Sequence, residues 1–259
     1  MSNRTAPPPD RKSAPIDLYF WPTPNCYKVS ILLEELALPY NVMAVHIGKG
    51  DQFTPAYEAI NPNGKVPALV DRDGPEGEPV TLFESGAIMI YLADKAGAYL
   101  PHDTSSPMTV LQWLMFQIGG VGPMLGQAHH FRKYAKTQIP YAVERYTREA
   151  ARIYRVLDTR LAKTPYLAGD YSIADMAVYP WLRPYRWQGQ DLADFENLQR
   201  WYSAVRARPA VQRGLGVMKQ RLERNRARPA GEAWDILFGD HQPNTQSGAV
   251  MPADGESLP

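Results

Sequence analysis

The sequence predicts an α/β domain followed by an all-α domain. Between residues 16 and 99, short apolar runs alternate with helical patterns in the order βαβ, loop, ββα. After residue 107, every apolar pattern has helical spacing. The chain has 259 residues, of which 44% are hydrophobic and 21% charged, as is typical of a globular protein. This length is sufficient for two domains of ordinary size.

The first domain is expected to contain four strands and two helices. The expected strands cover residues 16–20, 41–47, 65–71 and 79–83. The last two strands are joined by a turn at 73–77 that is rich in Gly and Pro. The first helix has an apolar face formed by Val29, Leu32, Leu33 and Leu36, and the second is marked by Ile88, Tyr91 and Leu92. Lys28 is expected to face solvent, and Tyr27 to pack.

The second half is expected to contain helices alone. They are predicted at residues 108–119 and 139–161, after a capping box at Ser172–Asp175, and around Leu198–Val205. The predicted organisation is a disordered extension at 1–14, domains at 15–99 and 108–220, a linker at 100–107 and a tail at 221–259. In the tail, the apolar segment Trp234–Phe238 is expected to dock on the rest of the chain.

Charge and composition exclude several classes of partner. The net charge of +1 gives no electrostatic footprint for nucleic acid or a membrane surface, so neither is expected as a partner. No apolar run approaches a membrane span, and no apolar signal core begins the chain, which predicts a cytoplasmic protein. His and Cys show no zinc-binding spacing, so no metal is predicted. The single cysteine, Cys26, excludes an internal disulfide and a Cys-x-x-Cys pair.

The turn from the first strand into the first helix concentrates groups that could act on a thiol. Thr23 and Asn25 are both expected to precede the helix, and both can donate a hydrogen bond to sulfur. The helix N-terminus also favours a thiolate over a thiol. Cys26 has two interpretations here: a small buried residue of the first turn, or a nucleophile of low pKa. Tyr19 lies inside the strand, where tyrosine is ordinary.

A second polar pair, Glu84 and Ser85, lies where the last strand meets the second helix. In one interpretation Ser85 is only the helix N-cap. In the other, Ser85 and nearby N–H groups bind a carboxylate while Glu84 binds an adjacent ammonium. An α-amino acid head group carries both charges. The pair is therefore a candidate receptor for such a head group.

Four motifs in order resemble the cytosolic-type glutathione transferases. They are Thr23-Pro24-Asn25, the segment 61–67 ending in Val66-Pro67, Phe83-Glu84-Ser85 and the capping box at 172–175. The segments at 48–53, 119–127 and 139–146 are similar to the bacterial nu-class branch, whose members are glutathione-dependent disulfide-bond oxidoreductases. This resemblance covers roughly residues 15–220. It implies a thioredoxin-like first domain with a mixed four-stranded sheet, in which the Val66–Pro67 peptide bond is cis.

The resemblance also implies roles for individual residues. Thr23 and Asn25 would face the glutathione sulfur, while Glu84 and Ser85 would bind its γ-glutamyl end. The peptide would lie along Val66 beside Pro67. Gln52 and Lys65 would lie near the glycyl end, although Gln52 could equally be a surface polar residue. Arg145 would hold a second glutathione between the domains.

Arg145 shares a predicted helix face with Tyr141 and Arg148, since the three lie at i, i+4 and i+7. A solvated charged face is the alternative interpretation of these three residues.

The implied activity is reduction of a disulfide, or of a small or organic peroxide, by glutathione. Because thiol–disulfide exchange needs an attacking and a resolving thiol, a chain with one cysteine requires two bound glutathiones or their disulfide. One alternative is conjugation of glutathione to an electrophile in a pocket lined by Met115, Phe116, Met124 and Trp181. Another is a non-catalytic binding or regulatory module. The expected partners are small thiols and disulfides, and a second copy of the chain as a homodimer.

Overall fold

The computed structural model describes residues 14–101, 106–220 and 229–239. In its first domain the chain forms β1 (Ile16–Phe20), α1 (Pro24–Glu35), β2 (Tyr40–Ala44), α2 (Pro55–Glu58), β3 (Ala68–Asp71), β4 (Val80–Phe83) and α3 (Ser85–Ala96). The sheet has the order β2-β1-β3-β4. The β1–β2 pair is parallel, and the β1–β3 and β3–β4 pairs are antiparallel. This mixed sheet confirms the expected thioredoxin-like fold.

The first expected strand has the observed bounds of β1, and the other three are longer than those observed. The second ends at Ala44, and Ile47 begins the 3-10 turn η2 (Ile47–Lys49), which is followed by η3 (Asp51–Phe53). The third begins only at Ala68, which pairs with Tyr19 of β1. Lys65 and Val66 therefore precede the sheet. The Val66–Pro67 peptide bond is cis, as predicted.

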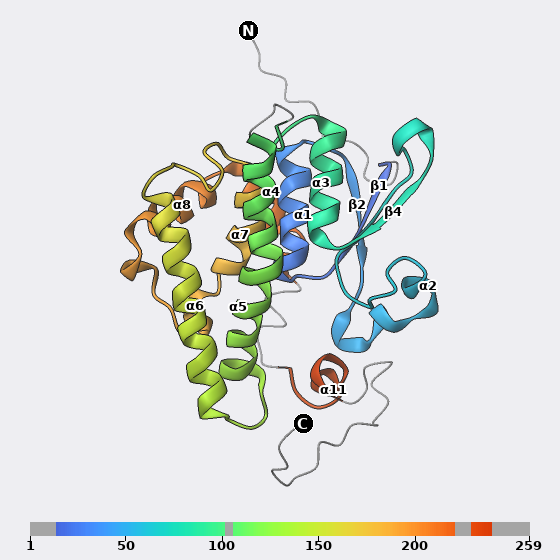
Figure 1. Ribbon diagram of the computed structural model, residues 1–259. Coiled ribbons are helices and arrows are strands. Elements are labelled where there is room, and N and C mark those ends of the chain that lie inside the picture. Colours follow the sequence, from blue (N-terminus) through green and yellow to red (C-terminus); the bar gives the residue numbers. More distant parts are fainter. Residues whose placement is uncertain (1–13, 102–105, 221–228, 240–259) are drawn as a thin grey trace, which may run out of the picture.

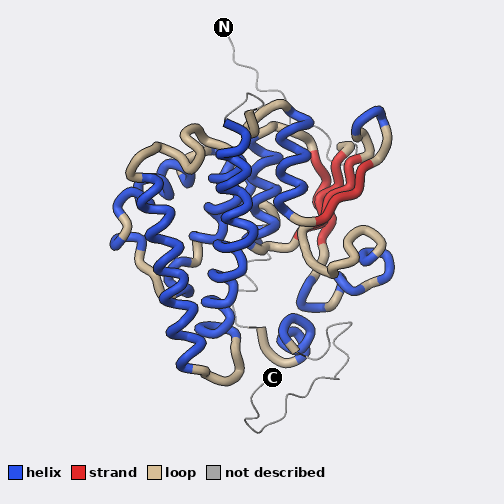
Figure 2. Tube along the Cα trace, viewed as in Figure 1, coloured by secondary structure: helices blue, strands red, loops and turns tan. Residues whose placement is uncertain are grey.

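Helices make up the second half, as expected. These are α4 (Ser106–Phe116), α5 (Gly122–His129), α6 (Pro140–Leu161), α7 (Ile173–Leu182), α8 (Glu196–Arg206), α9 (Pro209–Gly216) and α11 (Glu232–Phe238). Two π-helical turns, η5 (Gln117–Val121) and η6 (His130–Tyr134), flank α5. Figure 2 shows the strands along one side of this helical body. Within the described part of the chain, no helix has the length and apolarity needed to cross a bilayer.

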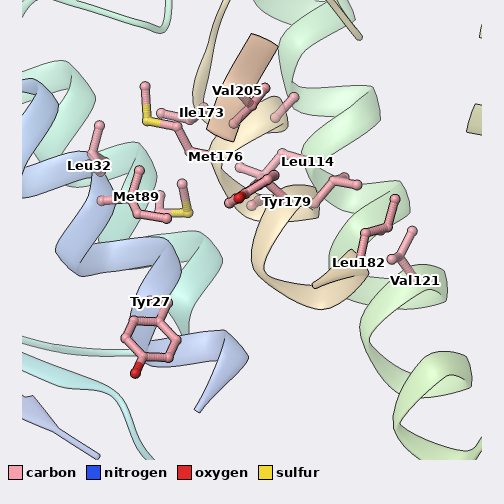
Figure 3. Packing of buried hydrophobic residues seen from close by; sticks show 14 of the residues in the cluster. Tyr27, Leu32, Met89, Leu114, Val121, Ile173, Met176, Tyr179, Leu182 and Val205 are labelled. Atoms are coloured by element: carbon pink, nitrogen blue, oxygen red, sulfur yellow. The ribbon is translucent and has the colours of Figure 1, made fainter. Parts of the chain in front are cut away.

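The helix α1 lies between the sheet and the second domain, where it packs against α3, α7 and α9. Its residues from Cys26 to Leu33 are all buried, because neighbours cover every side of the helix. Figure 3 shows Leu32 of α1 and Met89 of α3 facing Met176 of α7. One apolar core thus extends through both domains and fixes how they are placed.

Two details of α1 depend on this burial. The side chain of Lys28 is only 1% exposed, so the expectation that it faces solvent is wrong. On another side of the helix, Ser30 Oγ donates to the carbonyl of Gly214, at 2.9 Å. A Cβ on Gly214 would lie 2.6 Å from the Ile31 Cα, so this close approach of α9 requires glycine.

The capping box at the start of α7 is present as predicted. Ser172 Oγ accepts from Ala174 N–H at 3.3 Å, and the Asp175 carboxylate accepts from Ser172 N–H at 3.0 Å. Asp175 is also fully buried and accepts from the backbone of Leu167 and from Trp201 Nε1. The capping carboxylate therefore connects α7 to the preceding loop and to α8.

The segment Trp234–Phe238 forms the end of α11 and docks on both domains. Trp234 Nε1 donates to the Tyr134 carbonyl at 2.9 Å, and the ring of Phe238 stacks on that of Tyr134. On its other side α11 contacts η2 of the first domain. In Figure 1 the helix lies below the N-terminal end of α1. The expected docking of this segment is thus confirmed, and it spans the two domains.

Candidate functional site

The first component of the site is the N-terminus of α1. Thr23 is the N-cap, with extended backbone angles, and its Oγ1 accepts from Cys26 N–H at 3.3 Å. A threonine hydroxyl has one proton and two acceptor lone pairs. Because Oγ1 accepts within the helix, its one proton can be donated either to the Cys26 sulfur or to an incoming group. The dipole of α1 and its first-turn N–H groups favour an anion at the same place.

Asn25 is held by a residue from the second domain. Trp181 Nε1 of α7 donates to Asn25 Oδ1 at 2.9 Å. An indole N–H is a donor only, so the atom it meets must be the amide oxygen. This contact sets the amide orientation and leaves the two Nδ2 hydrogens of Asn25 to face the other way. The helix N-terminus therefore offers two side-chain donors, Thr23 Oγ1 and Asn25 Nδ2, to a thiolate.

Cys26 does not have the environment of a nucleophile. Its side chain is fully buried, and burial raises its pKa from 9.0 to about 12 despite a hydrogen bond from Thr23. A thiol in this state is almost entirely protonated at neutral pH. This burial and raised pKa argue against Cys26 as a low-pKa nucleophile. The residue is a small buried member of the first turn.

The second component is the N-terminus of α3. Ser85 is the first residue of that helix and is 5% exposed, whereas the N-cap position belongs to Glu84. The interpretation of Ser85 as an N-cap is wrong, because its Oγ makes no capping bond and instead accepts from Lys28 Nζ at 3.2 Å. Glu84 is exposed and has φ 68°, ψ 113°. Such angles are rare outside glycine and occur most often at functional sites.

The Lys28–Ser85 hydrogen bond connects these two components. It joins the second turn of α1 to the first residue of α3, and these two helices lie side by side and begin at the same end of the domain. Two positive helix ends and the hydroxyl of Ser85 are consequently grouped near the carboxylate of Glu84. The positive helix ends suit the carboxylate of a zwitterionic amino acid group, and the exposed Glu84 carboxylate suits its ammonium.

The loop before β3 forms a third side. The carbonyl of Lys65 accepts from Tyr57 Oη and Asn61 Nδ2, both at 2.6 Å, while the Lys65 side chain is exposed. Val66 follows outside the sheet ladder, and Pro67 is buried. These bonds fix the backbone that leads into the cis peptide. The backbone of Val66 is thereby held in one position, outside the ladder of the sheet.

Gln52 of η3 is 3% exposed, so its interpretation as a surface residue is wrong. Its Nε2 donates to the Ile47 carbonyl, and its Oε1 has no hydrogen-bond partner among the described residues.

Three candidate residues on α6 are not brought into this group. Arg145 and Arg148 lie with the exposed Tyr141 in a groove whose lining comes entirely from α6. Arg148 forms an ion pair with Glu144, and Arg152 pairs with Glu149. Among the residues the structure describes, Arg145 forms no ion pair. Its guanidinium is thus open to an added carboxylate, in a groove that includes neither Glu84 nor Ser85.

The apolar residues expected to line an electrophile pocket differ in exposure. Met115 is 48% exposed, whereas Phe116, Met124 and Trp181 are half-buried. Trp181 is moreover the residue that orients Asn25. In the described ranges, no group of three or more His, Cys, Asp or Glu could hold a metal ion.

Comparison with known proteins decides the family. Residues 23–95 match the glutathione S-transferase N-terminal domain, and residues 123–209 match the C-terminal domain of the same enzymes. The chain belongs to the glutathione S-transferase family. The disulfide-bond oxidoreductase YfcG of Escherichia coli is 49% identical to it over 80% of this chain and 96% of that protein. The disulfide-bond oxidoreductase YghU of the same organism is 42% identical over 77% of this chain and 74% of that protein.

Solved glutathione transferases show the same fold. One from Burkholderia graminis, with two glutathione molecules bound per subunit, has 44% identity and a TM-score of 0.77, covering 82% of this chain and 92% of that chain. One from Pseudomonas putida, with one glutathione disulfide bound per subunit, has 42% identity and a TM-score of 0.76, with coverage of 81% and 94%. Both of these neighbours of the glutathione S-transferase family member thus hold glutathione, as two molecules or as the disulfide.

Sequence reasoning missed two residues that contact the candidate site residues, Lys28 and Trp181. Lys28 was expected at the surface, although it lies four residues before Leu32 and so shares its stripe of the helix. Trp181 was considered only as a pocket wall, and its bond to Asn25 crosses 156 residues. No local pattern reports a contact of that separation.

Proposed function

We propose that this chain reduces disulfides at the expense of glutathione, with bound glutathiones rather than protein cysteines as the reacting thiols. The observation that carries the proposal is the state of Cys26. It is the only cysteine in the sequence, and its thiol is fully buried with a pKa of about 12. The protein therefore supplies neither the attacking nor the resolving thiol.

The reaction then proceeds in two exchanges. The thiolate of one glutathione attacks a sulfur of the substrate disulfide, forming a mixed disulfide and releasing one substrate thiolate, which takes up a proton. The thiolate of a second glutathione attacks the glutathione sulfur of the mixed disulfide, forming glutathione disulfide and releasing the second substrate thiol. An organic hydroperoxide fits the same scheme, because its O–O bond accepts the same two electrons and yields an alcohol and water.

The residues at the N-terminus of α1 would stabilise the first thiolate. The Thr23 hydroxyl and the Asn25 amide each donate a hydrogen bond to sulfur, and the helix dipole adds a favourable field. Together they lower the pKa of the bound thiol toward neutrality. Because Trp181 already fixes the Asn25 amide, its donors require no reorganisation when the thiolate forms.

The rest of the first glutathione would lie across the first domain. Its γ-glutamyl carboxylate and ammonium would contact Ser85 and Glu84, and its backbone would pair with Val66 beside Pro67. The glycyl end would reach Gln52 and Lys65, where the Gln52 Oε1 is without a partner among the described residues. Arg145 remains our prediction for a carboxylate of the second glutathione, since arginine meets a carboxylate in two parallel bonds. What supports it is the absence of an ion pair to Arg145 within the described chain.

Homodimer formation and a cytoplasmic location belong to the same proposal. The dimer of identical subunits remains a prediction that rests on the family motifs, and light scattering at several protein concentrations would test it. A glutathione-dependent reductase also needs a pool of reduced glutathione, as the cytosol provides.

The competing function is conjugation of glutathione to a hydrophobic electrophile, which needs one thiolate and an enclosed apolar wall. The exposure of Met115 and the use of Trp181 in orienting Asn25 disfavour such a wall. A purely regulatory module would have no need for the paired donors at α1.

A direct comparison of two reactions tests the proposed function. We expect kcat/KM for reduction of a small mixed disulfide to exceed that for conjugation of a model aryl halide by about tenfold or more, because only the first reaction uses two thiols at one site. Both assays would use the same enzyme preparation and glutathione concentration. Faster conjugation would support the transferase alternative, and inactivity in both, with glutathione still bound, would support the regulatory one.

A further inference from the structure

Lys28 is a buried cation directly behind the proposed head-group site. Its side chain is 1% exposed, and its Nζ lies 3.2 Å from Ser85 Oγ. Burial of an ammonium group is costly unless a negative charge compensates it. Within the described residues Lys28 forms no ion pair, so the structure places a cation in the core without a direct counter-charge.

The charged and titratable groups around Lys28 do not provide that compensation. On α3, Glu84 favours the ammonium by its charge, although its side chain is exposed. On α1 itself Cys26 has a smaller favourable influence, and after α7 the guanidinium of Arg183 lies over the ring of Tyr27, 5.4 Å from its centroid. At the far end of α1, Glu34 and Glu35 pair with Arg213 and Arg208 of the α9 segment. Burial consequently dominates and lowers the pKa of Lys28 to about 7.

We propose that Lys28 is a positioning residue whose ammonium orients the Ser85 hydroxyl toward the ligand carboxylate and takes up a proton when that carboxylate binds. The inference rests on the proposed function, in that it takes Ser85 as the contact of the γ-glutamyl head group.

The orientation follows from hydrogen-bond chemistry. An ammonium is a donor only, so Ser85 Oγ must accept from it, and the hydroxyl proton must point elsewhere. A carboxylate at the N-terminus of α3 would accept that proton together with backbone N–H groups. Ser85 Oγ would thereby link the Lys28 ammonium to the ligand carboxylate in a chain of two hydrogen bonds.

The proton uptake follows from electrostatics. A ligand carboxylate bound to Ser85 adds the negative charge that the buried ammonium lacks. This charge favours the protonated form of Lys28. With a pKa of about 7, half of the Lys28 side chains are charged near pH 7 in the free protein. Binding near pH 7 should then take up about half a proton per site.

Calorimetry with S-methylglutathione tests the proposal. This probe has the same head group but no titrating thiol, so proton release from sulfur does not enter the measurement. Titrations near pH 7 in two buffers of different ionisation enthalpy give the number of protons bound. We expect the wild type to take up a fraction of a proton per bound probe. Lys28→Met should lose that uptake and bind the probe at least about tenfold more weakly. The exposed Lys163→Met variant should match the wild type in both measurements.

The outcomes distinguish a failure of the Lys28 role from a failure of the proposed function. Binding by the wild type without proton uptake, or equal affinity and uptake in Lys28→Met, would overturn the role of Lys28 alone. Failure of the wild type to bind S-methylglutathione would overturn both. Should Lys28→Met not fold, the wild-type uptake decides the matter together with Ser85→Ala, in which the uptake should fall because the bridging oxygen is absent.

Discussion

Replacing Asn25 with alanine is expected to lower kcat/KM for disulfide reduction by about 100-fold, the usual cost of losing one preorganised donor to a developing anion. The physical reason is the Trp181–Asn25 bond of 2.9 Å, which occupies the amide oxygen and leaves the amide N–H groups to donate to the sulfur in the proposed site. Steady-state kinetics would measure this loss. A pH titration of thiolate absorbance should show that the pKa of bound glutathione rises in parallel.

Two further variants test whether the donor itself is responsible. Asn25→Asp keeps an oxygen for Trp181 but replaces the donor with a charged acceptor, so it should be at least as impaired as Asn25→Ala. Trp181→Phe keeps Asn25 and frees its amide, and should lose about tenfold. Wild-type activity in Asn25→Ala, with glutathione still bound, would remove Asn25 from the mechanism.

Replacing Asp175 with alanine is expected to reduce the free energy of unfolding by roughly 3–5 kcal/mol. Its fully buried carboxylate accepts from the backbone N–H groups of Leu167 and Ser172, both at 3.0 Å, and from Trp201 Nε1 at 2.7 Å. Alanine leaves these donors unpaired in the core and removes the reciprocal half of the capping box at the start of α7, while the N-cap Ser172 remains. Urea denaturation, followed by fluorescence, would measure the loss.

A matched control for Asp175 is Asp170→Ala, which removes an exposed carboxylate close by in the sequence and should change the unfolding free energy by less than about 0.5 kcal/mol.

The pH dependence of the unfolding free energy gives a second check on Asp175. Burial raises the pKa of Asp175 from 3.8 to about 6, so the folded chain keeps a proton that the unfolded chain has released. The stability contribution of this group should therefore fall as pH rises through that interval, and Asp175→Asn should lack this slope. Equal stability of Asp175→Ala and Asp170→Ala would contradict the account.

The order of elements could be predicted because each depends on local signals. The capping box at Ser172–Asp175 was predicted from such signals and agrees with the structure. The mixed sheet and the cis peptide at Val66–Pro67 also agree, but they were implied by the family resemblance. The start of β3 could not be predicted, because its pairing with β1, rather than residue preference, determines where it begins. The helical pattern of α1 showed one apolar face, whereas tertiary packing buries all sides from Cys26 to Leu33.

That burial explains most of what the sequence did not reveal about the site. Lys28 is inside because α3 and α7 cover α1. Ser85 is not the N-cap because the helix already begins at this residue, and its oxygen accepts from Lys28 instead. The orientation of Asn25 depends on Trp181 in the other domain. The residue types at the site were recognisable from motifs, but their charge states and orientations arise from contacts between distant segments.

The central claim is that glutathione supplies both reacting thiols, and turnover by Cys26→Ala tests it most directly. Alanine is close in volume to the buried thiol, so the variant should fold and retain most of the wild-type kcat/KM for disulfide reduction. Mass spectrometry of the wild-type protein during turnover should show no glutathione attached to Cys26. A folded but inactive Cys26→Ala, together with a glutathione adduct on Cys26 of the wild type, would contradict the claim.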